Sequence, residues 1–247
     1  AEEGVASDVV FVPISLSYEK VVEETEYRKE LTGGDKQAED LGGLVKTTGV
    51  LRRRYGRVYV RVAEGLSGKE MLDRVGGSIT ALDSDERKAF LKHAGEEILW
   101  DIHRATPVTP SALAATVLLS HDKRGMLVRE FHRRCGFVLR FLRHRGANFS
   151  NSLAAEPRDA LDEALGVFSD NKLVQIFEES DGDDIIAIVP ERRLTTDYYK
   201  NNIINHVAGA SMMALAVGPY GRSRDQAFER FAALRELLAI DVRNDPS

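Results

Sequence analysis

Residues 9–31 read VVFVPISLSYEKVVEETEYRKEL, and this stretch decides the fold of the amino-terminal part of the chain. The apolar run 9–16, interrupted by Pro13, is typical of a strand that is buried on both faces of a parallel sheet. Tyr18 and Glu19 follow it directly. Because ligands of open α/β sheets bind at the carboxyl ends of the strands, we expect Tyr18 and Glu19 at a ligand site. The alternative for Glu19 is a carboxylate that caps a helix.

A second strand is expected over residues 56–63, GRVYVRVA, in which β-branched and aromatic residues alternate with other residues. The residues between the two strands are numerous enough for a crossover connection, and a right-handed crossover between parallel strands is the default arrangement. The turn at 64–68, EGLSG, then ends this α/β portion. We predict a domain boundary after residue 66.

The remainder, residues 67–247, is predicted to be mainly helical with one β-hairpin. Asp83 or Ser84 is a candidate helix cap, and Pro110 after Thr109 is typical of the first turn of a helix. The hairpin is expected over 172–178 and 184–189, around an Asp-Gly turn. The helices are expected at 84–103, 110–118, 123–145, 157–168, 198–217 and 224–240.

Composition restricts the classes of function. The chain has 247 residues, 43% of them hydrophobic, and a formal net charge of -5, so global charge gives no reason to expect nucleic acid as a partner. The single cysteine, Cys135, is expected to be a small core residue. The histidines have no metal-ligand spacing. No apolar run reaches the roughly twenty residues that cross a bilayer.

Two clusters of basic residues are candidate anion-binding surfaces. The expected helix 123–145 contains eight Lys and Arg residues, among them Arg133 and Arg134, and a single acid, Glu130. Its cations can meet lipid phosphates, or pair with acids elsewhere in a core helix. The cluster of Arg52, Arg53, Arg54 and Arg57 can contact the phosphate of the substrate or of coenzyme A, or it can form a solvated face.

Three separated regions, which contain four sequence elements, resemble those of one enzyme family, in that family's order. Val12, Pro13, Tyr18 and Glu19 match the last block, Val-Pro-x-x-x-x-Tyr-Glu, of the membrane-bound glycerol-3-phosphate acyltransferases of bacteria and mitochondria. The other similar elements are the Glu-Leu-x-Gly-x-x-Lys turn at 30–36, the Val-Thr-Pro-x-x-Leu helix start at 108–113 and Tyr-Tyr-Lys-Asn-Asn at 198–202. The resemblance implies substrate positioning by Pro13, Tyr18 and Glu19.

The sequence also departs from this family. The family uses a His-x-x-x-x-Asp motif, in which His takes the proton from the attacking glycerol hydroxyl and Asp orients the imidazole. None of the six histidines here has Asp five residues later. We therefore expect no catalytic residue in this chain and interpret it as a carboxy-terminal portion that is inactive alone. Residues 1–66 then belong to the catalytic α/β domain, and the motif is expected upstream of Ala1.

The resemblance implies transfer of a fatty acyl group from acyl-CoA or acyl carrier protein to glycerol 3-phosphate, giving lysophosphatidate. It implies no metal or organic cofactor beyond the acyl carrier, and a peripheral location on the cytoplasmic side of the inner membrane at an anionic lipid surface. The rival interpretation is a winged-helix-like module that binds nucleic acid or protein. It rests on the succession of helices followed by the hairpin, with 123–145 as the basic contact helix.

Overall fold

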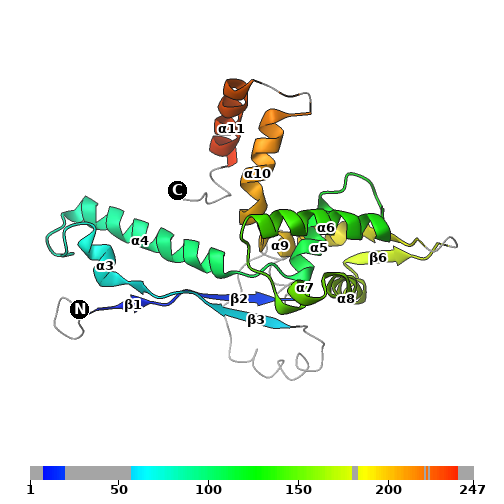
Figure 1. Cartoon of the computed structure of the whole chain (residues 1–247), viewed down its shortest axis with the longest axis horizontal. Coiled ribbons are helices and arrows are strands. Elements are labelled where there is room, and N and C mark those ends of the chain that lie inside the picture. Colours follow the sequence, from blue (N-terminus) through cyan, green and yellow to red (C-terminus); the bar gives the residue numbers. More distant parts are fainter. Residues whose placement is uncertain (1–7, 20–56, 180–182, 220, 222, 239–247) are drawn as a thin grey trace. The chain divides into compact units, whose positions relative to one another are not determined.

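The structure is a computed structural model that describes residues 8–19, 57–179, 183–219, 221 and 223–238. The chain forms two compact units. Unit 1 takes in Ala1–Ser17, Tyr59–Pro107 and Gly209–Ser247, and unit 2 takes in Tyr18–Val58 and Val108–Ala208. Figure 1 shows the elements of both units. The expected class, α/β with a mainly helical remainder and one hairpin, is confirmed. The expected domain boundary after residue 66 stays a prediction.

A β-ribbon replaces the parallel sheet that the sequence led us to expect. β1 (Val10–Phe11) pairs antiparallel with β4 (Leu66–Ser67), and β2 (Ile14–Tyr18) pairs with β3 (Val58–Val62). The carbonyl of Pro13 accepts from the amide of Ala63 at 2.9 Å, and the amide of Glu19 donates to the carbonyl of Arg57 at 3.1 Å. Residue numbers thus rise along β2 while they fall along β3, so the two strands are antiparallel. The expected parallel crossover is wrong for these two strands.

The register of the ribbon slips by one residue between its two halves. Pro13 lies opposite Ala63 and Phe11 lies opposite Leu66, so three steps on one strand match two on the other. This is the count of a β-bulge. Gly65 lies within it, and a Cβ atom there would lie only 2.7 Å from Cγ1 of Val10, so any other residue would force the Val10 side chain to shift.

The ribbon leads into two capped helices. Ser67 begins α3 (Gly68–Asp73), accepting from the amide of Glu70 at 3.0 Å, while its hydroxyl donates to Asp8 at 2.6 Å. Asp83, the expected cap, forms a capping box with Glu86 at the start of α4 (Ser84–Ala105). Ala105 is the one residue of α4 that is buried.

Unit 2 is built around α5 (Pro110–Leu119), which begins with Thr109 accepting from the amide of Ala112. Nearly the whole helix is buried, and it packs against α6 (Val128–His144), α8 (Pro157–Asp170) and α9 (Arg193–Asn201), as Figure 1 shows. The short helix α7 (Asn151–Ala155) packs against α8. The fully buried large side chains of this core are Val108, Leu113, Val117, Met126, Phe131, Leu142, Leu153, Phe168, Leu173, Ile186, Tyr199 and Ile203.

The expected hairpin is confirmed as β6 (Val174–Phe177) and β7 (Ile185–Ile188), which pair antiparallel. Its turn includes residues 180–182, which lie outside the described part of the chain. A third strand, β5 (Met126–Leu127), pairs with β7 and was not expected. Because residues 126–127 form this strand, α6 begins at Val128 rather than at residue 123.

The expected helix 198–217 is two helices. The 3-10 turn η1 (Pro190–Arg192) leads into α9, α9 ends at Asn201, and α10 (Ile204–Val217) follows after a turn. Tyr198 and Tyr199 therefore lie near the end of α9 and not at a helix start, and the Tyr199 ring packs on Phe168 with centroids 5.2 Å apart. The last helix is α11 (Arg224–Leu238). Among the described helices, none is both long and apolar enough to span a membrane.

Candidate functional site

The carboxylate of Glu19 closes the end of the β2–β3 pair. It accepts from the backbone amide of Arg57 at 2.9 Å and from the guanidinium of the same residue at 3.4 Å. The backbone amide of Glu19 returns a hydrogen bond to the carbonyl of Arg57. The Glu19 side chain is buried, so its charge is balanced by hydrogen bonds rather than by solvent. Glu19 and Arg57 thus hold the two strands in register at this end.

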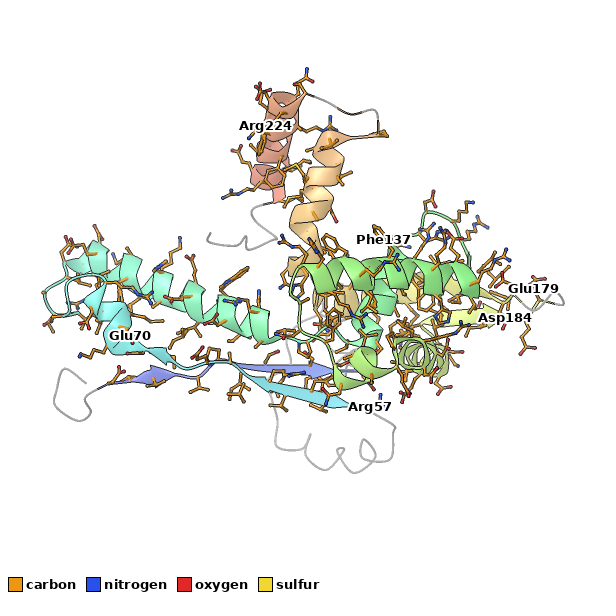
Figure 2. All side chains as sticks on the ribbon, in the orientation of Figure 1. Arg57, Glu70, Phe137, Glu179, Asp184 and Arg224 are labelled. Atoms are coloured by element: carbon orange, nitrogen blue, oxygen red, sulfur yellow. The ribbon has the colours of Figure 1, made fainter. Side chains whose placement is uncertain are left out.

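Two further contacts link this strand end to helices of unit 2. The Ser111 hydroxyl, in the first turn of α5, donates to the carbonyl of Glu19 at 3.1 Å. The Arg57 guanidinium, labelled in Figure 2, also lies 2.9 Å from the carboxylate of Glu163 on α8. Both partners of that ion pair are about half exposed, so it adds roughly 0–1 kcal/mol. The cluster Glu19, Arg57, Ser111 and Glu163 is called the strand-end cluster below.

Tyr18 and Glu19 do not lie on one side of the strand. Successive side chains of a strand point to opposite faces. Glu19 and Pro13 are buried, whereas Tyr18 is 42% exposed on the other face. The structure therefore places Tyr18 on the face opposite to Pro13 and Glu19, although the family resemblance grouped the three for substrate positioning. Arg52, Arg53 and Arg54 lie outside the described residues.

Helix α6 presents cations in two different situations. Arg134 is fixed on Glu130, with Nε donating at 2.7 Å, and this bond lowers the pKa of Glu130 below its usual range. Arg133 is exposed, 3.7 Å from the same carboxylate. Arg129, Arg133, Phe137, Arg140 and His144 follow one another at helical spacing and are all exposed. These five residues are called the outer α6 face, and Figure 2 labels its aromatic member, Phe137, which is 66% exposed. Nε of Arg129 also lies 2.8 Å from a carboxylate oxygen of Asp183.

One histidine and one aspartate lie close together although they are far apart in the sequence and do not form a His-x-x-x-x-Asp motif. Nε2 of His132 on α6 lies 2.8 Å from a carboxylate oxygen of Asp162 on α8. The pair joins two helices of unit 2.

Burial raises the pKa of the Cys135 thiol, which keeps it protonated and unreactive. In the described part of the chain, no three His, Cys, Asp or Glu side chains are placed to share a metal ion.

The elements that prompted the winged-helix interpretation are present, and α6 is basic, but α8 and the described residues beside the hairpin turn are acidic. Arg158 is the one cation of α8, against Asp159, Asp162, Glu163 and Asp170. The described residues next to the hairpin turn are also acidic, as Glu179 and Asp184 in Figure 2 illustrate. These carboxylates would repel a phosphate backbone.

Sequence reasoning grouped Arg57 with a phosphate-binding cluster, and it missed that Arg57 and Ser111 contact Glu19. It also missed that Glu163 pairs with Arg57. The pairing of Glu19 with Arg57 depends on the antiparallel register, and the expected parallel arrangement places other residues opposite Glu19. The Tyr-Glu pattern at the end of an apolar run was the available signal. It identified the correct strand end without its partners.

Comparison with known proteins tests the resemblance. A family model described as the glycerol-3-phosphate acyltransferase C-terminal region matches residues 27–244. Similar curated proteins, each named glycerol-3-phosphate acyltransferase, come from Pseudoalteromonas translucida, Ectopseudomonas mendocina and Pseudomonas fluorescens. The first is 28% identical over 222 residues, which is 86% of this chain and 26% of the relative. The second is 26% identical over 252 residues, 95% of this chain and 29% of the relative.

The third relative is 27% identical over 249 residues, again 95% of this chain and 28% of the relative. The chain thus spans between a quarter and three tenths of the length of these relatives. The resemblance that was inferred from the three regions is confirmed, and the winged-helix alternative gains no support. Since the family model covers most of its length, this chain belongs to the family of the glycerol-3-phosphate acyltransferase C-terminal region.

Proposed function

We propose that this chain is the carboxy-terminal part of an enzyme that transfers a fatty acyl group from acyl-CoA or acyl carrier protein to glycerol 3-phosphate. The match of the family model over residues 27–244 is the observation that carries this proposal. The product of the transfer is lysophosphatidate, the precursor of phospholipids. The acyl carrier is the only additional group that the reaction requires.

On this proposal the chain does not itself perform the proton transfer. Attack of a glycerol hydroxyl on a thioester needs a base within hydrogen-bond reach of that hydroxyl. The sequence has no His-x-x-x-x-Asp motif to supply it. The chain instead contributes the strand-end cluster and a helical unit to the complete enzyme.

The test compares two proteins in one assay. The 247-residue chain and the complete product of its gene are each incubated with glycerol 3-phosphate and radiolabelled palmitoyl-CoA, and lysophosphatidate is separated by chromatography. We expect product from the complete protein and none above background from the chain alone. Turnover by the chain alone would overturn the assignment of the proton transfer to residues outside it. Absence of turnover by the complete protein with either acyl donor would overturn the proposed activity.

Within the complete enzyme, Glu19 is proposed to act as a positioning residue and Tyr18 to contact substrate. Glu19 is buried and holds Arg57 and the strand end, whereas Tyr18 is exposed at the same strand end. We expect Glu19→Gln to lower kcat/KM by about tenfold and to lower the unfolding midpoint as well, because a misplaced strand end misplaces the substrate. Tyr18→Phe should raise KM with kcat and the unfolding midpoint unchanged. A change of stability without any change of kcat/KM in Glu19→Gln would reject the positioning role.

The outer α6 face is proposed to contact anionic lipid on the cytoplasmic side of the inner membrane. An exposed aromatic ring, Phe137, stands between Arg133 and Arg140, an arrangement that suits the boundary between headgroups and acyl chains. Each Arg near an anionic surface contributes about 1 kcal/mol. Arg134, which was grouped with Arg133 from the sequence, is held by Glu130 and is not part of this face.

Sedimentation with vesicles tests this contact. The chain should bind vesicles of phosphatidylglycerol and phosphatidylcholine, should bind pure phosphatidylcholine weakly, and should dissociate as salt is added. Replacing Arg133 and Arg140 by Glu should weaken binding at least tenfold, because two favourable charges become unfavourable. The control reverses the same charge at Lys92 and Arg158, which are exposed elsewhere. Equal loss in the control, or binding to duplex DNA instead of vesicles, would reject the lipid contact.

A further inference from the structure

The β2–β3 pair turns its apolar face outward. With Pro13 opposite Ala63 and Glu19 opposite Arg57, the directly opposed residues on this face are Ile14 with Val62, Leu16 with Val60 and Tyr18 with Val58. All six are exposed, from 42% for Tyr18 to 64% for Val62. Val10 and Val12, on the same side of the chain by alternation, are exposed as well. This set of residues is called the apolar ribbon face.

The opposite side of the same strand is polar and already covered. Ser15 and Ser17 are buried, and the Ser15 hydroxyl lies 2.7 Å from the Thr106 hydroxyl in the same unit. A sheet with one solvated face normally buries its apolar side chains and exposes its polar ones. Here the pattern is inverted. A shift of one residue would exchange the two faces, but the hydrogen bonds at both ends of the pair fix the register.

Among the described residues, the polar side of β2 is covered and the apolar ribbon face is not, so the inverted pattern indicates a face that still lacks its covering layer. Exposed apolar patches of this extent mark contact surfaces. In the described part of the chain, β2 and β3 pair with each other alone, so each keeps one edge without a neighbouring strand. A two-stranded ribbon has marginal stability by itself, and strands of this kind normally lie within larger sheets or against a helix.

We infer that the apolar ribbon face packs against an apolar layer of the same polypeptide that lies outside these 247 residues. The relatives are more than three times as long as the segment that they share with this chain, and the family model describes a carboxy-terminal region, so the covering partner has an identified source. A lipid bilayer is one competing occupant, which the vesicle experiment below distinguishes. A second copy of the chain is the remaining competitor. The inference rests on family membership and not on the proposed acyl transfer.

Cysteine labelling in the complete gene product tests the inference. Leu16→Cys places a thiol on the apolar ribbon face, and Val60→Cys repeats the experiment on the facing strand. Leu91→Cys is the matched control, since Leu16 and Leu91 are both 56% exposed and Leu91 lies on α4, away from the ribbon face. The native Cys135 is buried and gives little background.

We expect maleimide to label Leu16→Cys and Val60→Cys at least about tenfold more slowly in the complete protein than in the 247-residue chain, with the control unchanged. Equal labelling in the two proteins overturns the inference. Protection in the isolated chain that rises with concentration, together with dimer sedimentation, assigns the face to a second copy and also overturns it. Protection that appears only with phosphatidylglycerol vesicles would assign the apolar ribbon face to a lipid contact and would also overturn the inference. None of these labelling experiments measures acyltransferase activity. A failure of this inference is therefore distinct from a failure of the proposed function.

Discussion

Helices α4 and α5 are both well capped, yet only one of them is enclosed. In α5, eight of ten residues are buried, from Pro110 to Leu118. In α4, which is more than twice as long, Ala105 alone is buried and Leu91 and Leu99 are exposed. Capping sets where a helix begins, whereas burial decides how much tertiary contact stabilises it. The two helices therefore differ in how much tertiary contact they make within their own units.

The same difference extends to the units themselves. Unit 2 has a continuous core that runs from Val108 to Ile203 and joins its helices to the β5–β7–β6 sheet. Unit 1 has few buried apolar side chains and exposes the apolar ribbon face. Unit 2 therefore encloses most of its large apolar side chains, whereas the described residues of unit 1 leave most of theirs exposed. The following substitutions test this contrast, beginning with the largest expected effect.

Leu113→Ala should strongly destabilise unit 2. Leu113 is fully buried at the centre of α5, and truncation of such a side chain costs about 2–5 kcal/mol through lost transfer energy and a cavity. The counterpart in unit 1, Leu91→Ala, should change the free energy of unfolding by about 0.5 kcal/mol or less, because Leu91 is already exposed. Urea unfolding followed by circular dichroism and hydrogen exchange measures both. Similar losses for the two variants would contradict the contrast between the units.

Removal of a helix cap should destabilise the protein less than Leu113→Ala, and the destabilised region should be larger for α5 than for α4. Thr109→Ala removes the acceptor for the amide of Ala112 and should lower the free energy of unfolding of unit 2 by about 1 kcal/mol. Asp83→Ala removes the capping box with Glu86, and we expect rapid hydrogen exchange confined to the first turns of α4. Exchange spreading through all of unit 2 in the Asp83 variant would show that the units are not independent in this respect.

These contrasts also explain how far the sequence alone was predictive. Local signals sufficed where one residue type has one function: Asp83, Thr109 with Pro110, and the Asp-Gly turn located two helix starts and the hairpin. The local sequence did not determine the direction of β3 relative to β2, because an alternating strand has the same pattern in parallel and antiparallel pairs. The partner of Glu19 depended on that direction. The run 9–16 did indicate a strand, but its apolar side chains are exposed here.

Two boundaries were wrong for a similar reason. Residues 126–127 were assigned to a helix because Met126 and Leu127 continue its apolar periodicity, yet pairing with β7 makes them a strand. The stretch 198–217 was treated as one helix because it contains neither Gly nor Pro at the break, which falls at Asn202 and Ile203. Tertiary contacts override propensity at both places.

Acid should weaken both units through partly buried carboxylates, with a smaller effect than the substitutions above. The hydrogen bond from Arg134 lowers the pKa of Glu130 below 4.5, and hydrogen bonds from Ser67 and Lys69 lower the pKa of Asp8 below 3.8. A group with a lowered folded pKa contributes stability above its unfolded pKa and loses it as pH falls through the folded pKa. We therefore expect unfolding midpoints to fall below about pH 4.5 for unit 2 and below about pH 3.8 for unit 1. Glu130→Gln should flatten the first dependence and leave the second.

The smallest expected effect is that of Glu163→Gln. Arg57 has two carboxylate partners in unit 2, the buried Glu19 and the half-exposed Glu163. Solvent screens the exposed pair, so its loss should change the free energy of unfolding by about 0.5 kcal/mol or less, and less again in high salt. Glu19→Gln should cost clearly more, because it replaces a buried acceptor that receives the Arg57 amide. If urea titrations gave equal losses for the two variants, the strand end would be held by the surface ion pair rather than by the buried carboxylate.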